Sequence, residues 1–241
     1  MDKQVKPNSV LFLELFTEIE QKLKEICKDE FHSTFSELLR KAEKHSDVVY
    51  HFASDLKEFA QLRNAIVHTR RQNFIIAEPH DEVIAEMEKI HRLLYNPPKV
   101  FTVMTKNPVF TTPDDLLVDL ITNFSTKRIR RCPVVEKGSI VGMVTARTIT
   151  NWLASIKDTE ISIKSIKIRD VLEFTDKDEF IVVAKNSDIL SLIGQFRNSL
   201  KQGRYIQAAL VTDNGSIKSN LIGIVTPSDL PRLIEKVNYA D

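Results

Sequence analysis

The stretch Ile222-Gly223-Ile224-Val225-Thr226-Pro227-Ser228-Asp229-Leu230 decides the fold of the rear of this 241-residue chain. Its apolar first half is typical of a buried strand. Pro-Ser-Asp then supplies a helix start, because proline suits the first helical turn and Ser or Asp caps it. The first half recurs earlier as Val141-Gly142-Met143-Val144-Thr145. The rear of the chain therefore contains two copies of one unit.

Two further segments extend this repeat. Thr112-Pro113-Asp114-Asp115-Leu116 parallels Asn186-Ser187-Asp188-Ile189, and Val134-Val135-Glu136 parallels Leu210-Val211-Thr212-Asp213. Each copy reads strand, helix, strand, turn, strand, helix. The predicted strands are 109–111, 132–136 and 140–144 in the first copy, and 180–184, 208–212 and 221–225 in the second. The predicted helices are 116–124, 146–155 and 189–196, with a last one from about Pro227.

The front of the chain differs in composition from the rear. All six glycines lie from Gly138 onward, and residues 1–137 contain none. Because glycine serves sharp turns and positive φ, its absence favours helices joined by simple loops. Apolar residues at steps of three and four predict helices at 8–27, 34–44, 47–69 and 79–95. These four amphipathic segments predict an antiparallel four-helix bundle over residues 1–96, which Pro97-Pro98 ends.

Composition excludes several classes of protein. The 34 Lys and Arg residues balance 33 Asp and Glu, so the chain lacks the basic excess with which proteins hold duplex DNA. No apolar stretch approaches the ~20 residues of a membrane span, and the first residues lack the pattern of a signal peptide. The two cysteines, Cys27 and Cys132, form no metal-ligand spacing. We expect a cytoplasmic protein that needs no metal or cofactor and binds neither DNA nor a membrane.

Roughly residues 99–237 resemble a pair of CBS domains, the Bateman module. The motifs are Arg131-Cys132-Pro133-Val134-Val135, the segment Gly223–Leu230, and the leading segment Val100-Phe101-Thr102-Val103-Met104-Thr105-Lys106-Asn107-Pro108-Val109, which Ile168–Leu172 resembles less closely. The resemblance implies an α+β multidomain chain. After the bundle, CBS repeat 1 is expected at 97–157 and CBS repeat 2 at 158–241, with both repeats α/β and packed as a pseudo-two-fold pair.

The resemblance predicts a nucleotide site at Thr226, Ser228 and Asp229, and the chemistry agrees. Free N–H groups and the dipole at a helix start attract phosphate, to which the hydroxyl groups add hydrogen bonds. A carboxylate at this position can accept hydrogen bonds from two ribose hydroxyls. The expected regulatory ligand is AMP, ADP, ATP or a related adenine nucleotide. Thr-Pro-Ser-Asp is also an ordinary helix cap, so capping alone is the alternative interpretation.

Other residues are expected to complete this site. By resemblance, the opposite wall comes from the leading segment of the other repeat, near Lys106 to Val109. Arg204 and Tyr205 precede the middle strand of the second copy and are candidates to hold phosphate or base.

The first copy departs from the pattern. Thr145-Ala146-Arg147-Thr148 keeps the first hydroxyl but has Thr148 where the ribose-binding Asp belongs. Arg147 remains able to contact a phosphate. This site is expected to be weaker, empty, or specific for something other than a nucleoside. The acidic run of Asp176, Asp178 and Glu179 is interpreted as a solvated loop.

One segment of the front portion could carry catalysis. Gln61-Leu62-Arg63-Asn64-Ala65-Ile66-Val67-His68 resembles the motif of the HEPN superfamily, some members of which are metal-independent ribonucleases. By resemblance, His68 acts on the 2′-hydroxyl or the leaving oxygen, Arg63 stabilises charge on phosphorus, and Asn64 orients the pair. At about 100° per residue, Arg63 lies about 140° from His68, so convergence requires a two-fold dimer. The alternative is a bundle that only dimerises or serves as a scaffold.

These observations favour a regulatory protein over an enzyme. We expect a homodimeric sensor in which an adenine nucleotide on the CBS pair is coupled to the helical domain. The alternative is a nucleotide-gated endoribonuclease that uses Arg63 and His68 across a dimer interface, and only this alternative makes RNA a partner.

Overall fold

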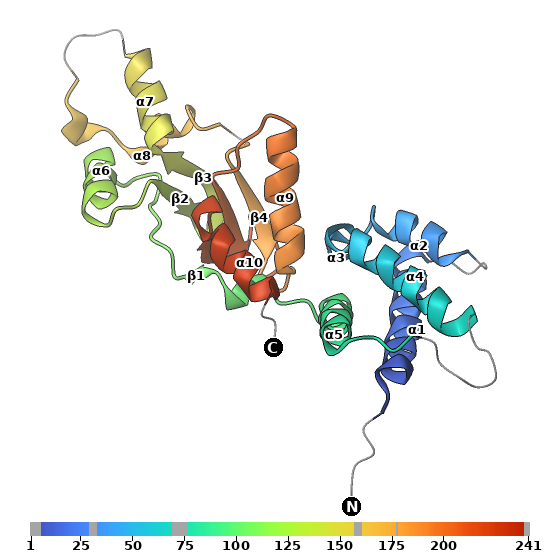
Figure 1. Cartoon of the computed structure of the whole chain (residues 1–241). Coiled ribbons are helices and arrows are strands. Elements are labelled where there is room, and N and C mark those ends of the chain that lie inside the picture. Colours follow the sequence, from blue (N-terminus) through green and yellow to red (C-terminus); the bar gives the residue numbers. More distant parts are fainter. Residues whose placement is uncertain (1–5, 29–32, 69–76, 157–160, 177, 239–241) are drawn as a thin grey trace, which may run out of the picture. The chain divides into compact units, whose positions relative to one another are not determined.

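The computed structural model describes residues 6–28, 33–68, 77–156, 161–176 and 178–238 (Figure 1). The chain divides into two compact units. One comprises residues up to Pro98 together with those from Val237, and the other is Lys99–Lys236. Among the described residues, the first unit is helical and the second contains the strands. The fold is therefore mixed α and β, with the predicted helical region at its N-terminal end.

The helical unit contains α1 (Asn8–Cys27), α2 (Phe35–Ala42), α3 (Asp47–His51), α4 (Ala53–His68) and α5 (Asp81–Tyr95). Helix α1 contacts α2, α4 and α5. Its predicted apolar stripe is buried, including Phe12, Phe16, Ile19 and Leu23. Because one helix presents these rings and branched chains to three neighbours, the core of this unit is built around α1.

The helix predicted over 47–69 is instead two helices that meet at Phe52. The backbone there leaves the helical region, with φ −105° and ψ 20°. The carbonyl of Phe52 accepts the first hydrogen bond of α4, from Leu56 N at 3.0 Å. The Phe52 ring is only 5% exposed, and the ammonium group of Lys89 lies 5.3 Å from its centre. The buried ring thus fixes a bend that the apolar periodicity does not reveal.

The second unit contains two sheets. A four-stranded sheet has the order β1 (Thr105–Lys106), β6 (Leu221–Val225), β5 (Ala208–Thr212) and β4 (Phe180–Ala184). In this sheet β4 and β5 pair in parallel, whereas β1 with β6 and β5 with β6 pair antiparallel. The strands β2 (Arg131–Glu136) and β3 (Ser139–Thr145) form an antiparallel hairpin. The predicted strands 180–184, 208–212 and 221–225 are all present. Because β1 belongs to the first copy and pairs with β6 of the second, the two copies share a sheet.

Helices cover these sheets, and two apolar clusters hold the unit together. The helices are α6 (Leu117–Thr126), α7 (Ala146–Ser155), α8 (Ile168–Leu172), α9 (Ile189–Lys201) and α10 (Leu230–Asn238). One cluster joins α6, α7 and α8 to the hairpin, with Trp152 among its buried members. The other joins Ile140 and Met143 of β3 to Ala208 and Leu210 of β5. The second cluster lies where the two copies meet and therefore fixes their relative position.

The strand predicted at 109–111 is reduced to one bridge. Thr111 pairs with Val134, and its N–H donates to the Pro133 carbonyl at 3.0 Å. Pro108 and Pro113 bracket the segment, and proline has no N–H to donate to a ladder. The segment therefore stays extended without forming a strand, which leaves the leading segment free to turn toward β6.

Candidate functional site

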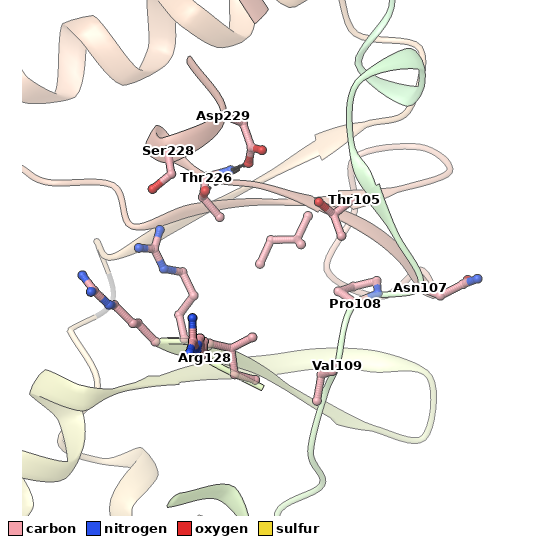
Figure 2. A pocket seen from close by; sticks show the side chains of 12 residues that line it. Thr105, Asn107, Pro108, Val109, Arg128, Thr226, Ser228 and Asp229 are labelled. Carbon is pink, nitrogen blue, oxygen red and sulfur yellow. Dashed lines mark hydrogen bonds between the residues drawn. The ribbon is translucent and has the colours of Figure 1, made fainter. Parts of the chain in front are cut away.

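A cavity of about 610 Å³ lies at the end of β6 (Figure 2). Three segments line it: the leading segment, the residues just before and at the start of β2, and the turn from β6 into the next helix. The lining residues are Thr105, Asn107, Pro108, Val109, Arg128, Ile129, Arg130, Arg131, Ile224, Thr226, Ser228 and Asp229. Thr226, Ser228, Asp229 and Val109 were predicted for one site, and the structure brings them together.

Gly223 positions the leading segment beside the site. Thr105 pairs with Ile224 and Lys106 with Gly223 in the β1–β6 ladder. A Cβ atom at Gly223 would overlap the sulfur of Met104 and lie 2.9 Å from its Cγ, so a larger residue would require Met104 to shift. Asn107 then takes a left-handed conformation, with φ 49°. Asparagine tolerates this region better than most residues, and the turn brings Pro108 and Val109 onto the cavity wall.

Asp229 caps the turn that follows β6. Its Oδ2 accepts hydrogen bonds from Thr226 N at 2.8 Å and Thr226 Oγ1 at 3.0 Å. The guanidinium of Arg232 lies 3.3 Å from Oδ1. The Asp229 side chain nevertheless keeps 22% of its surface exposed. The capping interpretation is therefore realised in the structure, and Asp229 still lines the cavity.

Arginines form the wall opposite Asp229 (Figure 2). Arg128 follows the end of α6 and has a positive φ of 52°. Arg131 is the first residue of β2, and its guanidinium donates to the carbonyl of Gln207. Burial lowers the pKa of Arg131, and the charge of Arg130 adds to this effect, whereas Tyr205 and the Asp229 carboxylate oppose it. The cavity thus holds partly desolvated positive charge that an anion would stabilise.

Three residues predicted for this site lie outside its lining. Lys106 is exposed on β1. Arg204 lies 3.5 Å from Asp178 and lines a separate pocket of about 230 Å³. Tyr205 is 54% exposed and lies near Pro227 and Leu230. Arg204 and Tyr205 belong to the segment before β5, whereas the cavity uses the equivalent segment before β2.

The charged cavity residues that were not predicted are Arg128, Arg130 and Arg131, and Thr105, Ile129 and Ile224 were not predicted either. A signal for the arginines was present. Arg204 was singled out because it precedes the middle strand of the second copy, and Arg128 holds the same position in the first copy. Applying the same rule to both copies would have found Arg128-Ile129-Arg130-Arg131.

The helix start of the first copy is arranged differently. Thr145 caps α7 reciprocally with Thr148: each backbone N–H donates to the other hydroxyl at 3.1 Å. Both threonines are buried, and Arg147 is exposed. Thr145 also donates to the carboxylate of Glu179 at 3.3 Å. Glu179 is only 4% exposed, so its interpretation as part of a solvated loop is wrong, although Asp178 nearby is exposed.

The segment that resembles the HEPN motif lies on α4. Arg63 donates to the Asn64 side-chain oxygen at 3.3 Å, and Asn64 is exposed. His68 is the last residue of α4, and its side chain lies outside the described residues. The catalytic roles of Arg63, Asn64 and His68 stay predictions.

In the described part of the chain, no group of three or more His, Cys, Asp or Glu side chains is placed to hold a metal ion. Within the same residues, every helix is too short or too polar to cross a bilayer.

Comparison with known proteins places a family on part of the chain. The chain is similar to the structure of an acetoin utilization protein (AcuB) from Vibrio cholerae, at 21% identity and a TM-score of 0.45 over 60% of this chain and 98% of that one. It is also similar to CBSX2 in complex with AMP, at 18% identity and a TM-score of 0.44 over 58% and 98%. None of the curated proteins matches it. The CBS domain family model matches residues 100–155, and this part of the chain is therefore a CBS domain.

Proposed function

We propose that the chain is a regulatory protein that binds one adenine nucleotide in the cavity at the end of β6. In this proposal the second copy is a CBS repeat like the first, and the two form a pair. The ribose hydroxyls bind Oδ1 of Asp229, which also accepts from Arg232 at 3.3 Å, and the phosphates face the arginines. Pro108, Val109, Ile129 and Ile224 offer the apolar surface that a base requires.

The charge of the cavity is the observation that carries this proposal. Its lining contains three arginines and one carboxylate, so an anion of at least two charges matches it. Guanidinium groups bind phosphate oxygens with paired, charge-assisted hydrogen bonds. A cavity of about 610 Å³ falls within the range of small-molecule sites. These features favour a nucleoside phosphate over a neutral or cationic nucleoside.

The same proposal explains how binding would be signalled. The leading segment is the first part of the second unit along the chain and follows the helical region directly. A ligand that bridges it to the arginines and Asp229 favours conformations in which these segments are held together. Such a ligand shifts the equilibrium between conformations with these segments apart and conformations with them held together only if it binds the two with unequal affinity. We include in the proposal that the helical region forms a homodimer and receives this signal.

Calorimetric titration of the full chain with AMP, ADP, ATP, 5′-methylthioadenosine and S-adenosylmethionine tests the proposal. We expect a phosphorylated nucleotide to bind and the two nucleosides without phosphate to bind at least tenfold more weakly. Hydrogen exchange in residues 8–95, with and without the best ligand, tests the coupling. Absence of binding by every phosphorylated nucleotide would refute the proposed function.

Variants of Asp229 must separate binding from capping. Asp229→Asn keeps an oxygen that can accept from Thr226 and removes the charge, so it should weaken binding with little loss of stability. Asp229→Ala should weaken binding and also lower the free energy of unfolding by about 1 kcal/mol, because the cap is lost. Asp188→Ala is the matched control, because Asp188 caps α9 by accepting from Ser191 N at 2.6 Å and is not among the cavity residues. It should lose similar stability and keep full affinity.

A further inference from the structure

The carboxyl group of Glu179 lies against the helix start of the first copy. It accepts from the Thr145 hydroxyl at 3.3 Å, and Glu179 is 4% exposed. Thr145 and Thr148 are 2% and 1% exposed. The polar groups that correspond to Thr226 and Asp229 therefore already face a carboxylate of the same chain.

The repeat places Glu179 at an equivalent position to a residue beside the open cavity. The register that aligns Asp115 with Asp188 also aligns Lys106 with Glu179. Lys106 points to solvent, whereas Glu179 is turned inward. Because Lys106 points outward, the space beside it in the second site stays open. Glu179 points inward and fills the equivalent space in the first site.

Backbone hydrogen bonds hold Glu179 in this position. Its carbonyl accepts from Gln207 N at 2.6 Å, and its N–H donates to the Asp176 carbonyl at 3.1 Å. Nearby, the hydroxyl of Thr175 donates to the Met143 carbonyl at 3.2 Å. These bonds tie the segment before β4 to the segment before β5 and to β3. The three corresponding segments, which are the leading segment, the segment before β2, and β6 with its following turn, surround the cavity of about 610 Å³.

We propose that Glu179 closes the ligand site of the first copy from within, so that each chain offers one open site. The side chain occupies the position facing Thr145, and its carboxylate repels phosphate. The charged groups that influence Glu179 are Arg147 on α7 and Asp176 in its own loop. Arg147 alone is cationic, and it is exposed, so it does not reverse the exclusion of an anion. This inference rests on the proposed function only for the choice of nucleotide probe.

Binding stoichiometry on the full chain tests the closure. With ATP as the probe, we expect one site in the natural protein, two in Glu179→Ala, and one in Glu179→Ala combined with Asp229→Ala. Glu173→Ala, which removes an exposed glutamate of the same region, should keep one site. Two sites in the natural protein, or one in Glu179→Ala, would overturn the inference. If only Glu179→Ala binds ATP, the closure stands and the proposed function fails.

A second measurement decides the matter if no variant binds ATP. Thr148→Cys, in a chain that also carries Cys27→Ser, reports access to the first site through its rate of alkylation by iodoacetamide. Cys132 gives little background, because burial raises the pKa of its thiol to about 12. Adding Glu179→Ala should accelerate alkylation at least tenfold, and adding Glu173→Ala should not. An unchanged rate with Glu179→Ala would refute the closure.

Discussion

Replacing Arg128 by glycine should make the protein more stable and a poorer nucleotide binder. Arg128 is an L-residue at φ 52°, in a region where side chains are disfavoured by about 1–2 kcal/mol. Glycine removes this strain but costs about 0.5–1 kcal/mol in additional entropy of the unfolded chain. The net gain is therefore about 0–1.5 kcal/mol, and each 1 kcal/mol raises the melting temperature by roughly 2–4 °C in a protein of this size.

The same substitution removes one of the three positive charges that line the cavity. A hydrogen bond from a charged group contributes about 1.5–3 kcal/mol, and Arg128 is exposed, so we take the lower end. Since about 1.4 kcal/mol corresponds to a factor of ten, ATP should bind about tenfold more weakly. Thermal unfolding and calorimetric titration of the same preparation measure the two effects.

Lys137 provides the matched control. It also has a positive φ, of 50°, but lies in the β2–β3 turn and not among the cavity residues. Lys137→Gly should raise stability as Arg128→Gly does and leave ATP affinity unchanged. Equal ATP affinity in Arg128→Gly and the natural protein would refute the assignment of Arg128 to the site. Weaker binding with a lower melting temperature would show that binding is lost through local unfolding instead.

Two further predictions concern stability. Burial raises the pKa of Glu179, so the folded protein disfavours the ionised form of this side chain. The natural protein should therefore lose stability as pH rises from the ordinary glutamate pKa of 4.5 through the raised pKa of Glu179. The Glu179→Gln variant has no titrating group at this position, so its stability relative to the natural protein should increase across this pH range and level off above it. Unfolding curves at several pH values measure this difference in stability, and a difference that does not change with pH would contradict the prediction. Gly223→Ala should destabilise the protein by about 1–3 kcal/mol, because the new Cβ would overlap the Met104 sulfur. Met104→Ala in the same chain should recover part of the loss, and no recovery on thermal unfolding would argue against this clash.

The parts of the fold that depend on local pattern could be predicted from the sequence. β4, β5 and β6 begin and end where the apolar runs and turn residues place them, and α1 buries the stripe read from its spacing. β1 could not be found in this way. It has two residues, and it exists because Thr105 and Lys106 pair with a strand more than a hundred positions later. A strand this short has no periodicity of its own.

The candidate site was predictable in part. Thr226, Ser228 and Asp229 are adjacent in the sequence, and the chemistry of a helix start identifies them. The resemblance also predicted an opposite wall near Lys106 to Val109, of which Val109 lines the cavity and Lys106 does not. Arg128 and Arg131 reach the cavity through the packing of the first copy on the second, which no local pattern encodes. Glu179 was missed for a related reason. In the sequence it belongs to an acidic run, and only the tertiary hydrogen bonds of its backbone turn its side chain inward.

Most differences between the two copies act in the same direction. Where the open cavity has Asp229, Arg130 and Arg131, the site of the first copy has Thr148, Ile206 and Gln207. Outward Lys106 corresponds to inward Glu179. The site of the first copy thus lacks the diol acceptor and two of the cations, and it has gained a buried carboxyl group. The exception is Arg147, which stands where the open cavity has Ser228 but is exposed. In the proposed function, a duplicated unit altered in this way engages its ligand at one edge of the shared sheet. That edge contains β1, so binding would act on the segment that follows the helical region in the chain.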